Sequence, residues 1–442
     1  MLTVAYLANQ FPSPVEPYVT DEILELRSRG VRVIAGSVYK AVVGDPEAAG
    51  SKCSPEIVLQ TIRIRLIIGA AWLCFTKGLR VLSLLARVLC RGTEPLTQRT
   101  KALAHTFLGA YYAAALRKRS VGHIHVHHGY FGSWVGMVAA KLLGISYSVT
   151  LHGSDLLLHA RYLDTKIGES RFCITVSEYN RGQILAHYPQ NDPGKIVVCR
   201  LGVELEPLLS LTAPRKLSPV FELLSAGRLH PVKDHAFLVK ACASLKAHGV
   251  NLRCLIAGEG PERAHLESLI RKLELEETVE LLGHLPRERL DLLLDQTDLV
   301  VLTSRSEGIP LVLMEAMARG KIVLAPNITG IPELVIDGKT GFLFEPGSEN
   351  SLVNRILSIR TGLLAATTEE YRRRNEGTKP HSPGMAGRAR SGFDWIRHAA
   401  RSHVMHNFNR ARNLESFSDL FIERVAPQIE SPTREDLVLQ QI

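Results

Sequence analysis

Short apolar runs in the first half of the chain alternate with stretches in which apolar positions recur every three or four residues. The runs predict strands, and the recurring stretches predict amphipathic helices. Strands are expected at Thr3–Ala8, Val31–Val38, His123–His127, Tyr147–Leu151 and Cys173–Val176, and helices at Val19–Arg29 and Ser133–Leu143. Strands separated by helices indicate βαβ units, and therefore a parallel sheet covered by helices.

The same alternation returns in the second half, after a stretch with no clear period. Strands are expected at Phe221–Ala226, Leu252–Ala257, Val279–Leu282, Leu299–Leu302 and Ile322–Ala325, and helices at His235–His248 and Glu262–Leu273. Two such α/β halves form a cleft between them. Ligands of these folds bind at the carboxyl ends of the strands.

The pattern divides the chain into five parts. Residues 1–206 are expected to form a first α/β domain, and residues 220–360 a second. Proline interrupts residues 207–219, which we interpret as the linker. Residues 361–394 are expected to form a mobile insertion, because glycine, proline, serine and basic residues are frequent in them. Residues 395–442 are expected to form a helical C-terminal segment.

The composition is that of a globular protein with two or three domains. The chain has 442 residues, of which 45% are hydrophobic and 22% charged, and one domain usually holds about 100–200 residues. The formal net charge of +9 favours anionic partners such as phosphates or anionic lipid. The basic residues are not gathered with aromatic residues into a recognisable module, so nucleic acid is not expected as a partner.

The cysteines and the N-terminal run indicate a reducing compartment. There are seven cysteines and no Cys-x-x-Cys pair, which argues against a disulfide framework or a zinc site. The opening MLTVAYLANQFPSP has no basic residue before its apolar run, so it predicts a first strand and not a signal peptide. We therefore expect a cytoplasmic protein.

The stretch Ile62–Cys90 is apolar but is interrupted by cations, namely Arg63, Arg65, Lys77, Arg80 and Arg87. A bilayer span needs about 20 apolar residues with few charges, so a membrane-crossing helix is not expected. Two interpretations remain open: a helix or helix pair packed on its own domain, which we favour slightly, or a basic amphipathic helix in contact with an anionic membrane surface. The second would place the protein at the inner face of the cytoplasmic membrane.

The clearest chemical motif is Glu307-Gly-Ile-Pro-Leu-Val-Leu-Met-Glu315, which follows the strand expected at Leu299–Leu302. Pro310 suits the first turn of a helix. The N–H groups of Gly308, Ile309 and Leu311 then lie at the start of that helix, where they can bind an anion such as a diphosphate. The two carboxylates beside them can accept hydrogen bonds from sugar or ribose hydroxyls.

Two glutamates separated by seven residues in this context resemble the signature of glycosyltransferase family 4. The segments QFPSPVEPYVTDEILELRSRGVRV and HIHVHHGYFGSWVGMVAAKLLGISYSVTLHGSDL resemble its subgroup that builds bacterial exopolysaccharides, including colanic-acid-type enzymes. The resemblance covers roughly residues 1–350 and, weakly, residues 404–425. It implies a GT-B fold: an acceptor-side and a donor-binding Rossmann-like domain that face a cleft. It also implies a retaining enzyme that takes a sugar from a nucleotide-sugar donor, a UDP- or GDP-sugar.

By this resemblance Glu307 contacts the donor sugar and Glu315 the ribose. Arg228 and Lys233 follow the first strand of the second half, where the family holds the donor diphosphate with an arginine and a lysine. Such cations can stabilise the leaving nucleoside diphosphate. The sequence has no Asp-x-Asp, so no metal or other cofactor is expected, and these cations are expected to replace the metal.

Three weaker motifs gain meaning from the same resemblance. His152 in the segment Thr150-Leu-His-Gly-Ser-Asp155 is similar to the family's cleft histidine near the reaction centre. Alternatively, it is a hydrogen-bonded core histidine. Gly258 lies in a turn near the nucleotide, and the backbone of His284 and Leu285 would read the base.

The run of histidines at 123, 125, 127 and 128 suggests a metal site, but no carboxylate or cysteine partner is evident in the sequence.

One loop departs from the family pattern. Many relatives have a Gly-Gly pair in their first loop, where this chain has Pro12-Ser-Pro-Val-Glu16. The acceptor is therefore the least defined partner, and a lipid-linked or polysaccharide acceptor at the membrane is expected.

The alternatives to a glycosyltransferase are a GT-B nucleotide-sugar epimerase, or a non-catalytic protein that binds nucleotides or glycans.

Overall fold

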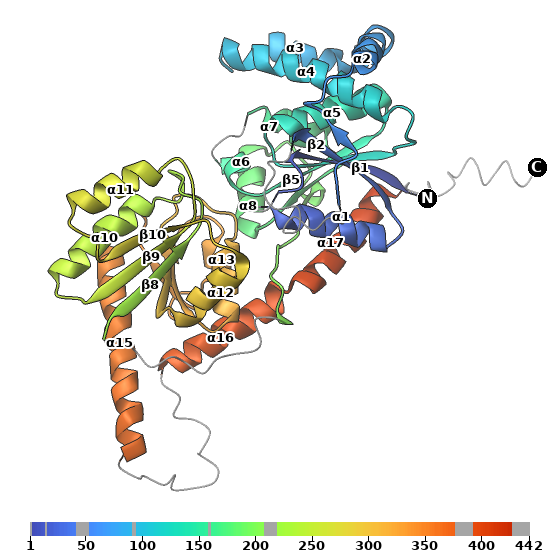
Figure 1. The fold of residues 1–442 in the computed structure, drawn as a ribbon. Coiled ribbons are helices and arrows are strands. Elements are labelled where there is room, and N and C mark those ends of the chain that lie inside the picture. Colours follow the sequence, from blue (N-terminus) through green and yellow to red (C-terminus); the bar gives the residue numbers. More distant parts are fainter. Residues whose placement is uncertain are drawn as a thin grey trace, which may run out of the picture.

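The computed structural model describes residues 2–13, 16–40, 53–90, 94–157, 161–206, 219–375 and 392–426. These residues form two α/β domains, each with a parallel sheet between layers of helices (Figure 1). The structure therefore confirms the predicted fold class, two Rossmann-like domains of the GT-B type.

The first domain is built on a parallel sheet that has seven strands among the described residues, in the order β3-β2-β1-β4-β5-β6-β7. Its strands are β1 (Thr3–Gln10), β2 (Arg32–Tyr39), β3 (Ile57–Val58), β4 (His123–His127), β5 (Ser146–Leu151), β6 (Phe172–Thr175) and β7 (Ile196–Val198). Its helices are α1 (Pro17–Ser28), α2 (Ile64–Lys77), η1 (Gly78–Val81), α3 (Leu82–Leu89), α4 (Leu96–Leu116), α5 (Phe131–Leu143), α6 (Ser154–Leu157), α7 (Leu163–Glu169), α8 (Glu178–His187) and η2 (Pro193–Lys195). Successive side chains of a strand point to opposite faces, so Ala5 and Leu7 pack in one core and Val4 and Tyr6 in another.

The second domain repeats this plan with six parallel strands among the described residues, in the order β10-β9-β8-β11-β12-β13. Its strands are β8 (Phe221–Ala226), β9 (Leu252–Ala257), β10 (Val279–Gly283), β11 (Leu299–Val301), β12 (Ile322–Pro326) and β13 (Phe342–Phe344). Its helices are α10 (His235–Ala247), α11 (Arg263–Lys272), α12 (Arg287–Gln296), α13 (Leu311–Ala318), α14 (Ile331–Leu334) and α15 (Glu349–Asn375). The apolar runs that predicted these strands are buried on both faces, as in most parallel sheets.

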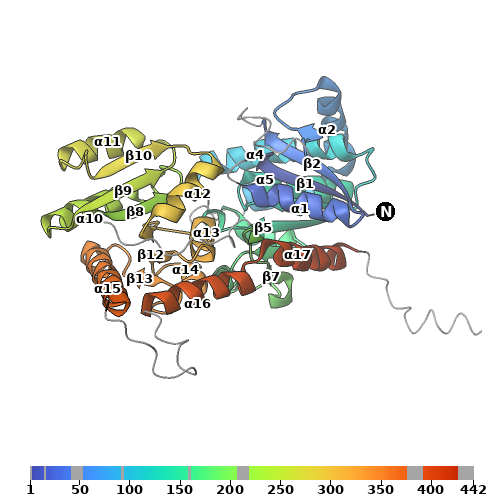
Figure 2. The ribbon, with the colours of Figure 1, turned by 60° about the horizontal axis from the view of Figure 1, so that its bottom comes forward.

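The C-terminal helices connect the second domain back to the first (Figure 2). Helix α16 (Gly392–Asn407) packs against α13, and α17 (Arg410–Val425) packs against α1. Phe417 and Phe421 of α17 are buried in the core of the first domain. The sequence pattern indicated one helical stretch here, but Asn409 begins a new helix, since its side chain accepts a hydrogen bond from the backbone N–H of Arg412.

Two of the expected boundaries differ from the structure. Helix α15 continues to Asn375, so the insertion expected to begin at residue 361 was placed too early. The helical C-terminal segment expected from residue 395 begins at Gly392, and its helices complete the cores of both domains. Residues 207–218 of the linker expected at 207–219, and residues 376–391 of the insertion expected at 361–394, lie outside the described residues.

The apolar stretch of the first domain forms α2, η1 and α3, which lie with α4 as an outer layer (Figure 1). Their inner face is buried in the domain core through Ala70, Leu73, Val81, Leu84 and Val88. By length and composition alone, residues 64–89 would suffice to cross a membrane, a test that core helices of soluble proteins also pass. The packed interpretation is therefore right for one face of these helices, and the opposite face is exposed.

Candidate functional site

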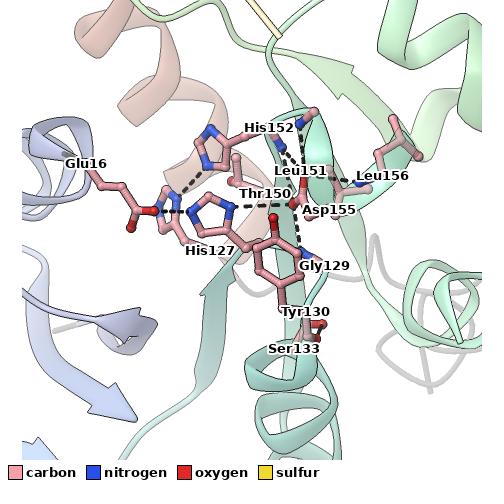
Figure 3. Close-up of polar contacts among 12 residues, drawn as sticks. Glu16, His127, Gly129, Tyr130, Ser133, Thr150, Leu151, His152, Asp155 and Leu156 are labelled. Atoms are coloured by element: carbon pink, nitrogen blue, oxygen red, sulfur yellow. Dashed lines mark hydrogen bonds and ion pairs between the residues drawn. The ribbon is translucent and has the colours of Figure 1, made fainter. Parts of the chain in front are cut away.

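The loop after β5 carries the predicted catalytic residue His152. The Asp155 carboxylate accepts hydrogen bonds from the backbone N–H groups of Gly129 (2.8 Å) and Leu156 (3.1 Å), as Figure 3 shows, and from that of Gly153 (2.8 Å). These bonds satisfy a buried carboxylate. They also fix the backbone of His152 at the carboxyl end of the strand.

His128 and Glu16 form a buried charged cluster with this aspartate. His128 Nε2 lies 3.0 Å from Glu16 Oε1, and its Nδ1 lies 3.6 Å from Asp155 Oδ2. Burial alone would lower the pKa of His128, but its contacts with the two carboxylates raise that pKa to about 10. Burial alone would raise the pKa of Asp155, but the hydrogen bond and charge of His128 hold it well below its usual range. The cluster ties the first loop of the chain to the loop after β5.

A chain of hydrogen bonds leads from His152 into the core. His152 Nε2 lies 3.0 Å from Nδ1 of His127, and Nε2 of His127 lies 3.0 Å from Oε2 of Glu22. The hydroxyl of Tyr6 also donates to this oxygen of Glu22. Tyr18 lies against His152 with its ring centroid at 4.7 Å.

The Glu22 carboxylate fixes the tautomers of both histidines. A carboxylate only accepts, so His127 donates from Nε2, and a neutral His127 keeps a lone pair on Nδ1. His152 then donates to that lone pair from its own Nε2. Burial and the charge of His128 lower the pKa of His152, which favours its neutral form. Its Nδ1 is therefore a buried acceptor with no hydrogen-bond partner in the part of the chain that the structure describes.

The histidine run has the carboxylate partner that the sequence analysis did not find. Glu22, His125 and His127 each offer one ligand atom, all within 4.8 Å of one another. However, both ring nitrogens of His125 are hydrogen-bonded, to Ser148 Oγ at 2.7 Å and Thr150 Oγ1 at 3.0 Å. A metal ion would have to displace these bonds, so the arrangement favours a hydrogen-bond network.

The second domain contributes Glu307 from the loop between β11 and α13. Its Oε1 accepts hydrogen bonds from Lys233 Nζ at 2.5 Å and from Ser304 Oγ at 2.6 Å. The structure thus brings the predicted sugar-binding carboxylate and a predicted diphosphate-binding cation into direct contact. A charge-assisted bond of this kind orients both side chains.

The start of α13 meets the histidine loop across the cleft. Pro310 is the N-cap and Leu311 the first helical residue, so the helix begins one residue after the proline that is expected in its first turn. A Cβ on Gly308 would lie 2.2 Å from the carbonyl oxygen of His152, so only glycine permits this approach. Ile309 is buried beside it. The contact joins the predicted catalytic residue of the first domain to the predicted anion-binding turn of the second.

Arg228 and Gly258 lie on adjoining turns at the carboxyl ends of β8 and β9. Gly258 donates a backbone hydrogen bond to Gly283 (2.8 Å), and a Cβ on Gly258 would lie 1.9 Å from the carbonyl oxygen of Gly227. Arg228 is exposed. The pKa of Glu16 is lowered despite burial, mainly by His128 and in part by the charge of Arg228. The arginine is therefore close enough to act across the cleft.

Glu315 lies along α13 and is bound by a residue that the sequence analysis missed. Arg287 Nη1 donates to its carboxylate, and Arg287 Nε lies 3.2 Å from Asp291. Burial raises the pKa of Glu315, although Arg287 opposes this effect. His284 is exposed and Leu285 is half-buried, just before α12.

Most of the predicted site residues therefore lie at the facing carboxyl ends of the two sheets. Reasoning from the sequence missed Glu22, Ser304 and Arg287, because each acts through a side chain that the linear pattern does not connect to it. Residues 14 and 15 of the Pro12–Glu16 loop lie outside the described residues. Within it, Glu16 has a defined role in the charged cluster.

Two family profiles match the chain. The profile described as Glycosyltransferase Family 4 matches residues 73–207, and the one described as Glycosyl transferases group 1 matches residues 215–374. The first match falls in the first domain and the second almost entirely in the second domain.

Named relatives match part of the chain. WcaL of Salmonella typhimurium, whose name assigns it to colanic acid biosynthesis as a glycosyltransferase, is 36% identical over 170 residues, 37% of this chain and 42% of WcaL. The amylovoran biosynthesis glycosyltransferase AmsK of Erwinia amylovora is 29% identical over 250 residues, 54% of this chain and 61% of AmsK. The chain thus spans about half the length of these relatives.

A solved structure shares the whole fold. HepE of Anabaena, solved in complex with UDP-glucose, aligns over 96% of this chain and 100% of its own with a TM-score of 0.64 and 18% identity. At this identity the likeness shows the fold alone.

Proposed function

This chain belongs to the Family 4 glycosyltransferases, and from that membership we propose that it transfers a sugar from a nucleotide-sugar donor to a growing glycan in exopolysaccharide synthesis. The names of WcaL and AmsK support the exopolysaccharide assignment. HepE, which shares the fold, is solved with UDP-glucose, and a donor of that class is proposed for this chain.

The observation that carries the proposal is the meeting of Lys233, Glu307 and His152 at the cleft. Glu307 accepts the hydrogen bond from Lys233 (2.5 Å). The next residue of its loop, Gly308, lies close to the backbone of His152. A donor bound there would place its diphosphate near cations and backbone N–H groups, and its sugar near a carboxylate and a neutral imidazole. This matches a reaction in which negative charge develops on the departing diphosphate.

In the proposed reaction the bond between the sugar C1 and the diphosphate oxygen breaks, and a bond from C1 to an acceptor hydroxyl oxygen forms with retained configuration. The acceptor hydroxyl gives its proton to the departing phosphate oxygen, and the nucleoside diphosphate leaves with the bonding electron pair. Arg228, Lys233 and the start of α13 would stabilise that leaving charge, so the reaction would need no metal. The neutral Nδ1 of His152 would accept a hydrogen bond from a sugar hydroxyl.

The donor would be a UDP- or GDP-sugar, with Glu315 and the turns at Gly258, His284 and Leu285 around its nucleoside. The acceptor would be a lipid-linked or polysaccharide glycan at the cytoplasmic face of a membrane. The proposed roles of the two domains follow: the first approaches the acceptor and the second holds the donor.

A donor panel tests this proposal. Purified protein is incubated with each common UDP- and GDP-sugar, and the nucleoside diphosphate released by slow hydrolysis is measured. We expect release from one donor or a small set, and none with Glu307→Gln. Release from no nucleotide sugar, or equal release by the variant, would contradict the proposal.

A further inference from the structure

The outer face of α2, η1 and α3 carries a stripe of exposed apolar side chains. Phe75 and Leu79 are 87% and 86% exposed, and the other members are Ile64, Ile68, Trp72 and Leu82. Ile64, Ile68, Trp72 and Phe75 are spaced by three or four positions within α2, so they share one side of that helix, and Leu79 and Leu82 follow in η1 and at the start of α3. We call this set the outer stripe.

Apolar residues thus occupy both sides of these helices. The inner side is buried in the core through residues such as Leu73 and Leu84, whereas the outer stripe is exposed. A helix that is apolar all round is normally buried on all sides or placed in lipid. Contiguous exposed apolar surface of this kind marks an interaction site.

The charged residues around the stripe indicate what kind of partner it can bind. Between Ile57 and Cys90 the chain contains no aspartate or glutamate. Arg87 is neutralised within the domain by Glu94 at 2.9 Å and Asp164 at 3.2 Å. Arg80 donates to the carbonyl oxygen of Leu142. The stripe therefore has cations near it in the sequence, including Arg63, Arg65 and Lys77. The segment that carries the stripe has no acidic residue.

This pattern fits an anionic bilayer better than a second copy of the chain. Two copies joined through the stripe would bring like charges together, whereas anionic headgroups would neutralise them. We propose that the outer stripe docks on an anionic membrane, with its apolar side chains in the headgroup–acyl boundary and its cations among the headgroups. The helices lie on the membrane and do not cross it, because their inner face is packed in the protein core. This inference does not depend on the proposed reaction.

Vesicle sedimentation tests the proposal with matched variants. The protein is mixed with vesicles of phosphatidylcholine alone or with phosphatidylglycerol, at low and high salt. We expect sedimentation with anionic vesicles that weakens at high salt. The stripe variant Ile68→Ser/Phe75→Ser/Leu79→Ser should bind at least about ten-fold more weakly, and Arg63→Gln/Arg65→Gln/Lys77→Gln should lose the preference for anionic lipid. These positions are exposed or half-buried, so the fold should persist, and circular dichroism checks this.

Two control variants lie on the second domain. Leu292→Ser removes an exposed apolar side chain from α12. Arg271→Gln/Lys272→Gln/Arg289→Gln removes three exposed cations. Both should bind vesicles as the unmodified protein does. Equal loss in the controls would mean that binding reflects overall charge or hydrophobicity, and the proposal would be wrong.

Tryptophan fluorescence reports the depth of the stripe. The chain has three tryptophans; Trp134 is buried, and Trp72 and Trp395 are exposed. In a Trp395→Phe protein the exposed signal comes from Trp72. We expect a blue shift with anionic vesicles and quenching by brominated acyl chains.

Three outcomes would overturn the proposal. The first is a failure to bind anionic vesicles, or equal binding by the stripe variant. The second is a dimer in sedimentation velocity that the stripe variant dissolves, which would assign the stripe to a second copy. The third is bound protein that resists extraction at high pH, which would mean that the segment spans the bilayer.

Discussion

At the scale of single residues, the proposed chemistry depends on Glu307 more than on any other side chain. We expect Glu307→Gln to lower the turnover number by at least roughly 100-fold, since a lost charged hydrogen bond costs about 1.5–3 kcal/mol and more when the group acts in the transition state. Steady-state kinetics with the donor found in the panel measures this. Glu276→Gln, at an exposed position of the same domain, is the control and should have full activity. Normal turnover by the Glu307→Gln variant would remove Glu307 from the site.

The hydrogen-bond chain behind His152 gives a second residue-scale prediction. His127→Asn keeps an acceptor near the position of Nδ1, whereas His127→Leu removes it. We expect the leucine variant to lower the turnover number by roughly 10- to 100-fold with little change in the donor KM. Without the acceptor at His127, nothing in this network fixes the tautomer and ring orientation of His152. The asparagine variant should recover much of the activity. Equal loss in both variants would show that His127 serves only the core.

Residue-scale reasoning from the sequence reached the motif residues but not their partners. Pro310 predicted a helix start within the motif, and the structure begins this helix at Leu311. The bonds from Ser304 to Glu307 and from Arg287 to Glu315 could not be predicted, because they depend on side-chain directions in the folded loops. The sequence pattern places Glu22 in an amphipathic helix. Its burial beside His127 is a tertiary effect that this pattern does not predict.

At the scale of elements, the charged cluster of His128, Glu16 and Asp155 couples loop stability to pH. The pKa of His128 is raised from an ordinary 6.5 to about 10, so its protonated form stabilises the folded state. That contribution is complete below about pH 6.5 and is lost as the pH rises through about 10.

We therefore expect His128→Asn to lower the melting temperature most near about pH 6. Asparagine suits this position because His128 has a φ of 69°, which asparagine tolerates. The difference between the two proteins should shrink as the pH rises toward the raised pKa of His128. Thermal melts across this range measure it, and a difference that grows with pH would contradict the assigned charge state.

Helix α17 illustrates what element-scale pattern alone leaves open. Its helical character was predicted, but its partner was not, because a periodic apolar face does not say which core it joins. Phe421 is fully buried beside Tyr6 and Phe172 of the first domain.

We expect Phe421→Ala to destabilise the first domain by about 3–5 kcal/mol, because it opens a cavity in a packed core. Met405→Ala at a more exposed position of α16 should have little effect. Urea unfolding monitored by circular dichroism compares the two variants. Similar midpoints would indicate that α17 is not part of the folded core.

At the scale of the whole molecule, the alternation of strands and helices was sufficient to predict two parallel-sheet domains. The crossing of α16 and α17 between the domains was not predictable in this way, since it arises from contacts between distant segments (Figure 2). The contact of the His152 loop with Gly308 likewise requires both domains in place.

The cations at the cleft lead to a whole-enzyme prediction about metal. If Arg228 and Lys233 neutralise the leaving diphosphate, EDTA should leave activity largely intact. Arg228→Ala and Lys233→Ala should instead weaken nucleoside diphosphate binding, as measured by calorimetry. Full loss of activity in EDTA that magnesium restores would contradict a metal-independent site.

The central claim is that the cleft moves a sugar onto an acceptor. The most direct test incubates the protein with its labelled nucleotide sugar and a lipid extract of the source membrane, and measures label in the lipid-linked or polymer fraction. We expect label to enter this fraction with the unmodified protein and not with Glu307→Gln. Consumption of the donor with label only in free or epimerised nucleotide sugar, and never in an acceptor, would contradict the claim.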